Sequence, residues 1–337
     1  SLVALGGPFS CFRMSSNMTR LPVVVLLALA FAGCAVPVQR ARTSVVQMPY
    51  ERELDAQERY EDRACSERLG FLFPGVGHFC LRKPEVGTAL ATLGAAELGL
   101  AVAGFSQFSS NDPRALLPAV AFQNTYIVGI VDPILERQRA AKLLYTPQDS
   151  LDELLYAPFN PEVLRRPDVW IGILVTAATQ GLFLALDNSD RSRKVNVFGR
   201  EFEPETGYPL SAAALGATFG HVAIGEEVLF RGYIQSNLTR RFGTFGGWAG
   251  GTLIFGAAHI PNAFLLETRQ ERNDYLRFAL PVITGVGGYF GASYLWNDYS
   301  LAPPVALHFW YNFMLGLASM IADPDDGFLS AEIRVPW

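Results

Sequence analysis

Long apolar stretches with almost no charge are the dominant pattern in this chain. Residues 169–186, 252–266 and 278–296 are largely uncharged and rich in glycine, alanine, leucine and aromatic side chains. A helix that crosses a bilayer needs roughly 17–25 mostly apolar residues, so stretches of about this length predict membrane-spanning helices. A soluble all-α domain that buries these helices in a large core is the alternative interpretation.

The same pattern extends along the chain and predicts an all-α fold, a polytopic membrane helical bundle of about seven spans. The expected spans are residues 86–108, 115–135, 168–186, 208–225, 245–265, 278–297 and 301–322. Glu97, Asn124 and Asp132 fall within the first two spans. Because polar groups are costly in lipid, we expect these two spans to pack within the bundle or to lie partly at its interface.

The first 34 residues have the pattern of a targeting segment. Arg20 precedes an apolar stretch over residues 21–32, and Gly33 and Cys34 follow it. This order is typical of a secretory signal peptide. The segment Leu-Ala-Phe-Ala-Gly-Cys resembles a bacterial lipoprotein box, which implies that Cys34 is lipidated and becomes the new N-terminus. An uncleaved anchor helix, forming an eighth span, is the alternative.

Changes in composition divide the chain into five parts. We expect a targeting segment, a polar linker, an N-terminal membrane region of unknown role, a C-terminal membrane domain and a tail at residues 1–34, 35–85, 86–200, 201–322 and 323–337. Cys65 and Cys80 lie close together in the linker. We expect them to form a disulfide if this segment faces an oxidising compartment.

Charge and motif content exclude some classes of function. The net charge is −5 and the pI is near 5.5, so the sequence offers no basic surface for nucleic acid. No phosphate-binding GxxxxGK[ST] or GxGxxG pattern occurs, so nucleotide binding has no support. Only 18% of residues are charged, against about 25% in soluble domains, which favours the membrane interpretation.

The first candidate site is a pair of adjacent carboxylates at the end of an apolar stretch. Glu227 and Arg231 are four residues apart, so they share one helix face and are expected to pair. Glu226 then points about 100° away around the helix and is left for another role. If Arg231 neutralises Glu227 and leaves Glu226 unpaired, the two carboxyl groups have different pKa values. A plain Glu–Arg pair at a helix end is the alternative.

Two further polar positions lie on later apolar stretches. Phe255 and His259 share one helix face, and His308 and Asn312 share another. Each has a structural interpretation, as a packing histidine or as a hydrogen-bonded link between helices. Because a bundle brings inward-facing polar residues together, three such positions on successive spans favour a single polar cavity.

The ordered set EExxxR, FxxxH and HxxxN resembles the signature of the CAAX protease and bacteriocin-processing (CPBP) family, which includes the CAAX prenyl endopeptidases. The resemblance covers about residues 208–320. It implies an intramembrane endopeptidase that hydrolyses a peptide bond in a polar cavity of a helical bundle. The residues it assigns to catalysis are Glu226, His259, His308 and Asn312, with Glu227, Arg231 and Phe255 in support.

The resemblance also implies a role for each catalytic residue. Glu226 would activate a water with help from His259, and His308 with Asn312 would stabilise the oxyanion. Family members are often described as metalloproteases, and Glu226, His259 and His308 could ligate zinc. Because these histidines lack HExxH spacing and lie on different helices, we expect a metal-free mechanism with no cofactor.

The apolar spans and the family resemblance together imply a multi-pass protein of a bacterial inner membrane. The lipoprotein box implies that its N-terminus is lipid-anchored on the outer side, while the Lys and Arg content of the connections leaves the orientation of the bundle open. The expected partners are the lipid bilayer and a membrane protein or lipidated peptide as substrate, and not nucleic acid. One alternative is a catalytically silent family member that acts as a scaffold, a bacteriocin-immunity protein or a regulator. A small transporter is another, because it would also carry polar groups at membrane depth.

The lipoprotein box predicts a specific mature N-terminus. Intact-mass measurement of the purified protein should show a chain that begins at Cys34 and carries added acyl mass. A chain that still contains residues 18–33 and carries no lipid would contradict this prediction.

Overall fold

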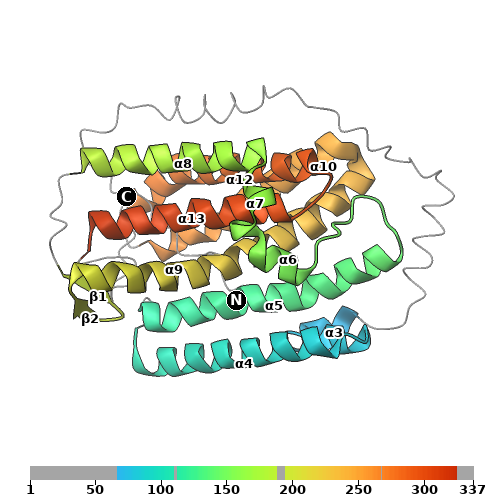
Figure 1. The fold of residues 1–337 in the computed structure, drawn as a ribbon, viewed down its shortest axis with the longest axis horizontal. Helices are drawn as coiled ribbons and strands as arrows, with labels where there is room; N and C mark the ends of the chain where they lie inside the picture. The colour runs from blue at the N-terminus through green and yellow to red at the C-terminus, as the bar shows by residue number, and fades with distance from the viewer. Residues whose placement is uncertain (1–66, 110–111, 188–193, 267, 325–337) are drawn as a thin grey trace.

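The computed structural model describes residues 67–109, 112–187, 194–266 and 268–324, and long helices dominate this part of the chain (Figure 1). The long helices are α4 (Pro84–Gln107), α5 (Pro113–Ala140), α8 (Pro167–Leu186), α9 (Pro204–Glu227), α10 (Ser236–His259), α12 (Leu280–Trp296) and α13 (Ala302–Ala322). The predicted all-α fold is therefore confirmed. The targeting segment at residues 1–34 and the start of the linker lie outside the described residues.

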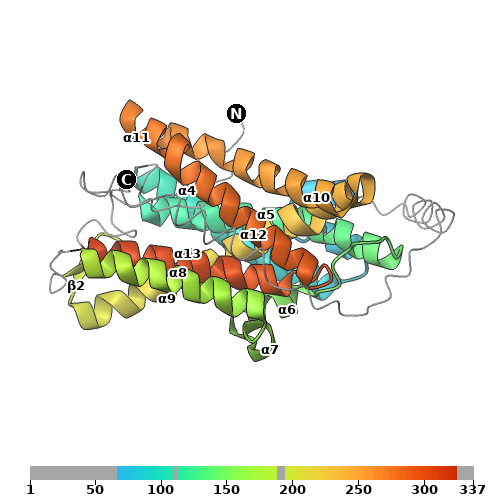
Figure 2. The same cartoon turned by 90° about the horizontal axis from the view of Figure 1, so that it is seen from above.

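The long helices form two layers. One layer follows the order α8, α13, α9, α5 and α4, and α10 and α12 pack against it from behind (Figure 2). The elements α9, α10, α12 and α13, which carry the predicted motifs, therefore enclose a common interior. The helix hairpin of α4 and α5 extends the layer on the side of α9.

Five helical segments are long and apolar enough to cross a membrane: Pro84–Gln107, Pro113–Ala140, Pro167–Leu186, Arg269–Trp296 and Ala302–Ala322. They coincide with five of the seven expected spans. The other two expected spans correspond to α9 and α10, each 24 residues long. Helices α9 and α10 lie in the same bundle.

Short elements connect the long helices. These are η2 (Glu67–Phe71), α3 (Val76–Cys80), α6 (Leu151–Tyr156), η3 (Ala157–Phe159), α7 (Pro161–Leu164), β1 (Val195–Val197), β2 (Arg200–Phe202), η4 (Val228–Gln235), η5 (Ile260–Leu265), α11 (Arg269–Asp274) and η6 (Tyr275–Ala279). The antiparallel β1–β2 hairpin turns at Phe198 and Gly199, both with positive φ. This hairpin was not expected from the sequence.

Residues 67–80, from the expected polar linker, form η2 and α3 and pack against α4 and α5. Cys80, at the end of α3, is disulfide-bonded. Its expected partner Cys65 lies outside the described residues, so the Cys65–Cys80 pairing stays a prediction.

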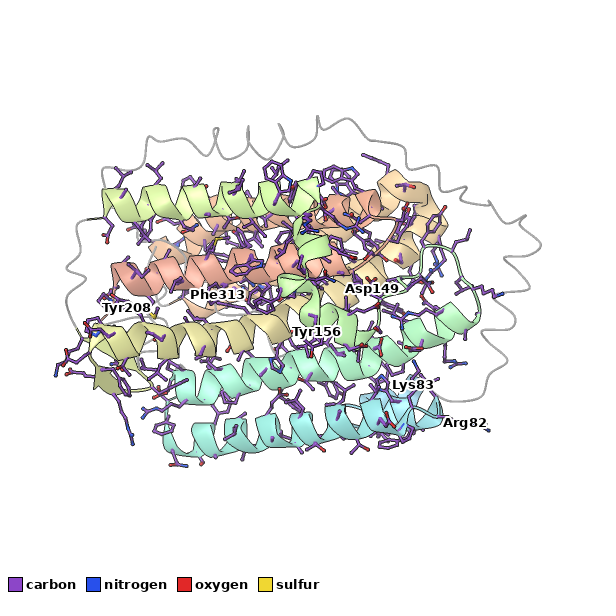
Figure 3. The ribbon with its side chains drawn as sticks, viewed as in Figure 1. Arg82, Lys83, Asp149, Tyr156, Tyr208 and Phe313 are labelled. Carbon is purple, nitrogen blue, oxygen red and sulfur yellow. The ribbon has the colours of Figure 1, made fainter. Side chains whose placement is uncertain are left out.

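Asp149 fixes the turn between α12 and α13. Its carboxylate accepts hydrogen bonds from the Leu301 backbone N–H at 2.7 Å and from the Ser300 hydroxyl at 2.6 Å. It lies in the connection that leads to α6, beside the start of α13 (Figure 3). A carboxylate at a helix N-terminus satisfies backbone donors that have no partner within the helix. The connection before α6 therefore anchors the helix that carries His308.

Helix α10 contains a sharp reversal at Gly243, where φ is 75° and ψ is 174°. Such a backbone conformation favours glycine, because a side chain would be strained there. The second half of α10 runs back along its first half and η4. A Cβ at Gly247 would collide with Thr239, and one at Gly251 would lie 3.1 Å from the Cβ of Gln235. Small residues thus allow the two segments to pack backbone to backbone.

This reversal sets the register of the site. His259 follows Gly243 by as many residues as Glu227 precedes it, so the returning helix brings His259 back to the level of the two carboxylates. Between them, Phe230 and Phe255 pack with ring centroids 5.0 Å apart. The local geometry of one glycine therefore positions the second motif against the first.

Candidate functional site

The two adjacent carboxylates lie where α9 passes into η4, a segment of π-helix. Glu226 is 5% exposed and Glu227 is fully buried. π-helical segments are rare and often occur at functional sites. Both carboxylates therefore need partners inside the bundle, because an uncompensated charge is costly there.

Glu227 joins two of the predicted site residues. Its Oε1 accepts a hydrogen bond from Arg231 Nη1 at 2.9 Å and one from His308 Nδ1 at 2.8 Å. The pairing with Arg231 was predicted from the four-residue spacing and is present. The contact with His308 was not predicted, because the two residues are far apart in sequence. Since an ionised carboxylate only accepts hydrogen bonds, Nδ1 carries the proton and Nε2 is directed toward Glu226.

One carboxylate oxygen and two imidazole nitrogens come close together beside the Glu227–His308 hydrogen bond. Glu226 Oε2 lies 3.8 Å from His308 Nε2 and 4.0 Å from His259 Nε2. His259 Nδ1 donates to the Phe255 carbonyl oxygen at 2.8 Å, which orients the ring. These separations exceed hydrogen-bond length, and a single water can bridge them. Glu226 Oε2 has no hydrogen-bond partner among the described residues.

Asn312 lies one helical turn beyond His308 on α13 and is 3% exposed. Its Oδ1 has no hydrogen-bond partner within the described part of the chain. Asn312 and His308 line the same small pocket. The structure therefore brings Glu226, His259 and His308 together directly and places Asn312 beside His308.

Aromatic rings fix the histidines and Arg231. The Phe255 ring lies 4.6 Å from that of His259 and has the Arg231 guanidinium 4.4 Å above it. A cation over an aromatic face is stabilised electrostatically. The Phe290 ring of α12 lies 5.1 Å from His308. Phe255, predicted as a supporting residue, therefore contacts both histidine and arginine.

Helix α12 contributes to the site although no motif pointed to it. Arg231 Nη2 donates to the Gly287 carbonyl oxygen at 2.6 Å, and Gln235 Nε2 donates to that of Gly291 at 3.0 Å. A Cβ at Gly287 would collide with Phe255. The glycine spacing in α12 is a signal for close helix packing that could have identified this contact from the sequence.

The N-terminal region also reaches the site. Asn124 of α5 packs against Gly225, where a Cβ would collide with the Asn124 side chain. His221, which precedes Glu226 on α9, instead pairs with Glu97 of α4 at 2.9 Å. His221 therefore links α9 to α4 and takes no part in the cluster around Glu226.

The donor atoms around Glu226 lie slightly farther apart than the ligands of a bound zinc ion. Zinc holds ligands at about 2.0–2.2 Å in a tetrahedron, which places ligand atoms roughly 3.3–3.6 Å apart, below the 3.8 and 4.0 Å measured from Glu226 Oε2. Among the described residues, no group of three or more His, Cys, Asp or Glu side chains is arranged to hold a metal.

Comparison with known proteins adds one match. Residues 208–314 match the family model described as type II CAAX prenyl endopeptidase Rce1-like. This range holds Glu226, Glu227, His259, His308 and Asn312. No curated protein and no solved structure matches the chain.

Glu227 is predicted to act on stability through its two partners. Glu227→Gln should lower the free energy of unfolding by about 3–5 kcal/mol, because it leaves a buried Arg231 charge uncompensated. Thermal unfolding in detergent would measure the change. Glu201→Gln, on the exposed strand β2, is the matched control and should have little effect. Equal melting temperatures for the two variants would contradict the prediction.

Proposed function

The chain carries a CAAX protease family domain at residues 208–314, and from this premise we propose that it is an intramembrane endopeptidase. It hydrolyses a peptide bond in a membrane-associated protein or a lipidated peptide. The observation that carries the proposal is the convergence of Glu226 Oε2 with the Nε2 atoms of His259 and His308 inside the bundle. Among the described residues, this buried carboxylate oxygen faces two imidazoles and has no hydrogen-bond partner, a costly arrangement that packing alone does not require.

Glu226 is the general base in this proposal. A water held between Glu226 Oε2 and the two imidazoles gives its proton to Glu226 as its oxygen attacks the scissile carbonyl carbon. The His259 ring is fixed by its Nδ1 hydrogen bond to Phe255, so Nε2 accepts from the water's second hydrogen. The water is thereby oriented as well as activated.

His308 and Asn312 stabilise the oxyanion that forms from the substrate carbonyl. The Asn312 amide donates from Nδ2, and His308 donates from Nε2 when its ring carries both protons, with Nδ1 held by Glu227. When the intermediate collapses, the carbon–nitrogen bond breaks. Glu226 passes its proton to the departing amine, which restores the carboxylate.

The mechanism proposed is metal-free. Both proton transfers, from the water to Glu226 and from Glu226 to the departing amine, run through the Glu226 carboxylate, and the donor atoms are spaced slightly more widely than zinc ligands. If zinc were bound after the donors move together, Glu226, His259 and His308 would hold it, and it would supply Lewis acidity to the water. Zinc content is therefore a direct test.

The protein is a multi-pass membrane protein, and we propose the bacterial inner membrane as its location, with the N-terminus lipid-anchored on the outer side. The five apolar helical segments support membrane insertion. The lipoprotein box before Cys34 supports the anchor. A substrate that is itself embedded in or attached to the bilayer would reach the cluster without leaving the membrane.

Glu226→Gln is predicted to abolish most activity. The substitution keeps the size of the side chain and removes the base, so the cleavage rate should fall by about 10²-fold or more. Comparative proteomics of membranes that contain wild-type or variant protein would identify peptides released by the wild type alone. Glu201→Gln should retain wild-type activity.

Three outcomes would revise the proposal in different ways. An active Glu226→Gln enzyme would exclude Glu226 as the base. Stoichiometric zinc whose removal abolishes activity and whose return restores it would exclude the metal-free mechanism. A wild-type protein that releases no peptide from membranes would favour a catalytically silent scaffold, immunity protein or regulator.

Asn312→Ala is predicted to slow the chemical step while leaving substrate binding largely intact. Removal of one oxyanion donor should lower kcat by about 10²–10³-fold, or about 2.7–4 kcal/mol in barrier height. Steady-state kinetics on a released peptide would separate kcat from KM. Asn237→Ala, on α10 away from the cluster, is the control. An unchanged kcat would exclude Asn312 from the oxyanion site.

A further inference from the structure

The connection between α5 and α6, residues 141–150, has a strained backbone. Lys142 and Tyr145 have φ angles of 55° and 62°, in the left-handed region that residues other than glycine rarely adopt. The turn between α12 and α13 has the same feature, with φ angles of 53° at Asp298 and 64° at Tyr299. Such conformations persist only where the surrounding structure holds them in place.

Two arginines, one from α5 and one from α10, hold the 141–150 connection by its backbone carbonyl groups. Arg139 donates to the carbonyl oxygens of Pro147 at 2.7 Å and Asp149 at 2.9 Å. Arg240 donates to the carbonyl oxygen of Leu144 at 2.7 Å. Arginine suits this task because its planar group presents several donors in a rigid arrangement. The connection is therefore fixed to two long helices at once.

The 141–150 connection in turn holds the start of α13. The Asp149 carboxylate accepts hydrogen bonds from the Ser300 hydroxyl and the Leu301 backbone N–H. The Tyr145 ring packs against the Tyr299 ring, with centroids 4.8 Å apart. The backbone of Asp149 is thus held by α5, and its side chain holds α13 (Figure 3). The two strained segments stabilise each other.

The groups that orient Arg139 also come from the N-terminal membrane region. Glu136 accepts a hydrogen bond from Arg139 Nη1 at 2.8 Å, and the buried Asp132 has its Oδ1 3.6 Å from Arg139 Nη2. The other Asp132 oxygen pairs with His78 of α3 at 2.9 Å. All of these residues lie outside the range 208–314 that matches the family model.

Helix α13 carries this placement to the proposed oxyanion donors. His308 follows Leu301 by seven residues, about two helical turns, and Asn312 lies one turn further. A helix with its hydrogen bonds intact behaves as a rigid element. A displacement of its first turn would therefore move His308 Nε2 and the Asn312 amide relative to Glu226.

We propose that the 141–150 connection sets the position of His308 and Asn312, and that Asp149, Arg139 and Arg240 are positioning residues for the reaction. This inference rests on the proposed peptidase function. The domain at residues 208–314 holds the reacting groups, and the N-terminal membrane region fixes the helix that carries two of them. Asp149 is the residue to test, because its carboxylate binds α13 directly.

Nuclear magnetic resonance can follow His308 without a substrate. The chain has four histidines, so full-length protein labelled with ¹⁵N-histidine gives few ring signals, and those of His308 are the ones lost in His308→Gln. Asp149→Asn keeps the size of the side chain and replaces one accepting oxygen by a donor. The His308 signals should shift, whereas the His221 signals on α9 should stay in place and show that the bundle is folded.

Asp152→Asn is the matched control, because it makes the same substitution on the exposed first turn of α6. It should leave the signals of all four histidines unchanged. Ser300→Ala removes only the hydroxyl that donates to Asp149. It is the milder variant to use if Asp149→Asn does not fold, and it should shift the His308 signals in the same direction.

Steady-state kinetics measure the consequence for the reaction. The substrate is a synthetic peptide that spans the cleavage site identified by proteomics of the membranes. Asp149→Asn should lower kcat by about 10-fold or more, because small displacements of reacting groups slow the chemical step strongly. KM should stay close to that of the wild type, since loss of folded protein alone changes neither constant per folded molecule.

The outcomes separate this inference from the proposed function. His308 signals that stay in place in both Asp149→Asn and Ser300→Ala would overturn the positioning role and leave the peptidase proposal intact. A kcat equal to that of the wild type in both variants would do the same. Wild-type protein that cleaves no membrane peptide would overturn the peptidase proposal, and the His308 signals would still decide whether the 141–150 connection positions α13.

Discussion

The arrangement of the site depends on one buried carboxylate, that of Glu227. Its Oε1 binds Arg231 on its own helical segment and His308 on α13, at 2.9 and 2.8 Å. A buried charge without partners would cost several kcal/mol, so both partners contribute to the stability of the fold. Arg231 in turn donates to the Gly287 carbonyl of α12. One negative charge thus ties together α9, η4, α12 and α13.

The same carboxylate explains why its neighbour can have a different role. With Glu227 holding Arg231 and His308, Glu226 is directed toward the two Nε2 atoms, and its Oε2 has no hydrogen-bond partner among the described residues. Adjacent residues on a helix point about 100° apart, which separates a structural from a reactive environment within one turn. Two like residues in sequence thereby face two different surroundings.

The sequence predicted the helical bundle, the Glu227–Arg231 pair and the three motifs that meet, because helical spacing and apolar runs are local properties. It did not predict the His308–Glu227 contact or the packing of Phe290 against His308. Those contacts join residues far apart in the chain, and Phe290 is an apolar side chain with no chemical signature. The β1–β2 hairpin was missed because each strand has only three residues, too few to show the alternation of apolar and polar side chains that identifies a strand.

Because the chain reverses at Gly243, the number of residues on each side of this glycine determines whether His259 lies level with Glu227. Because His259 and Glu227 are equally far from that glycine, an insertion or deletion of one residue on either arm would turn every later side chain by about 100°. His259 would then face lipid or a different helix, although the sequence of each motif would be unchanged. The length of this segment is therefore under the same functional constraint as the residues themselves, and a chain that kept all three motifs with a different spacing here would not assemble the same site.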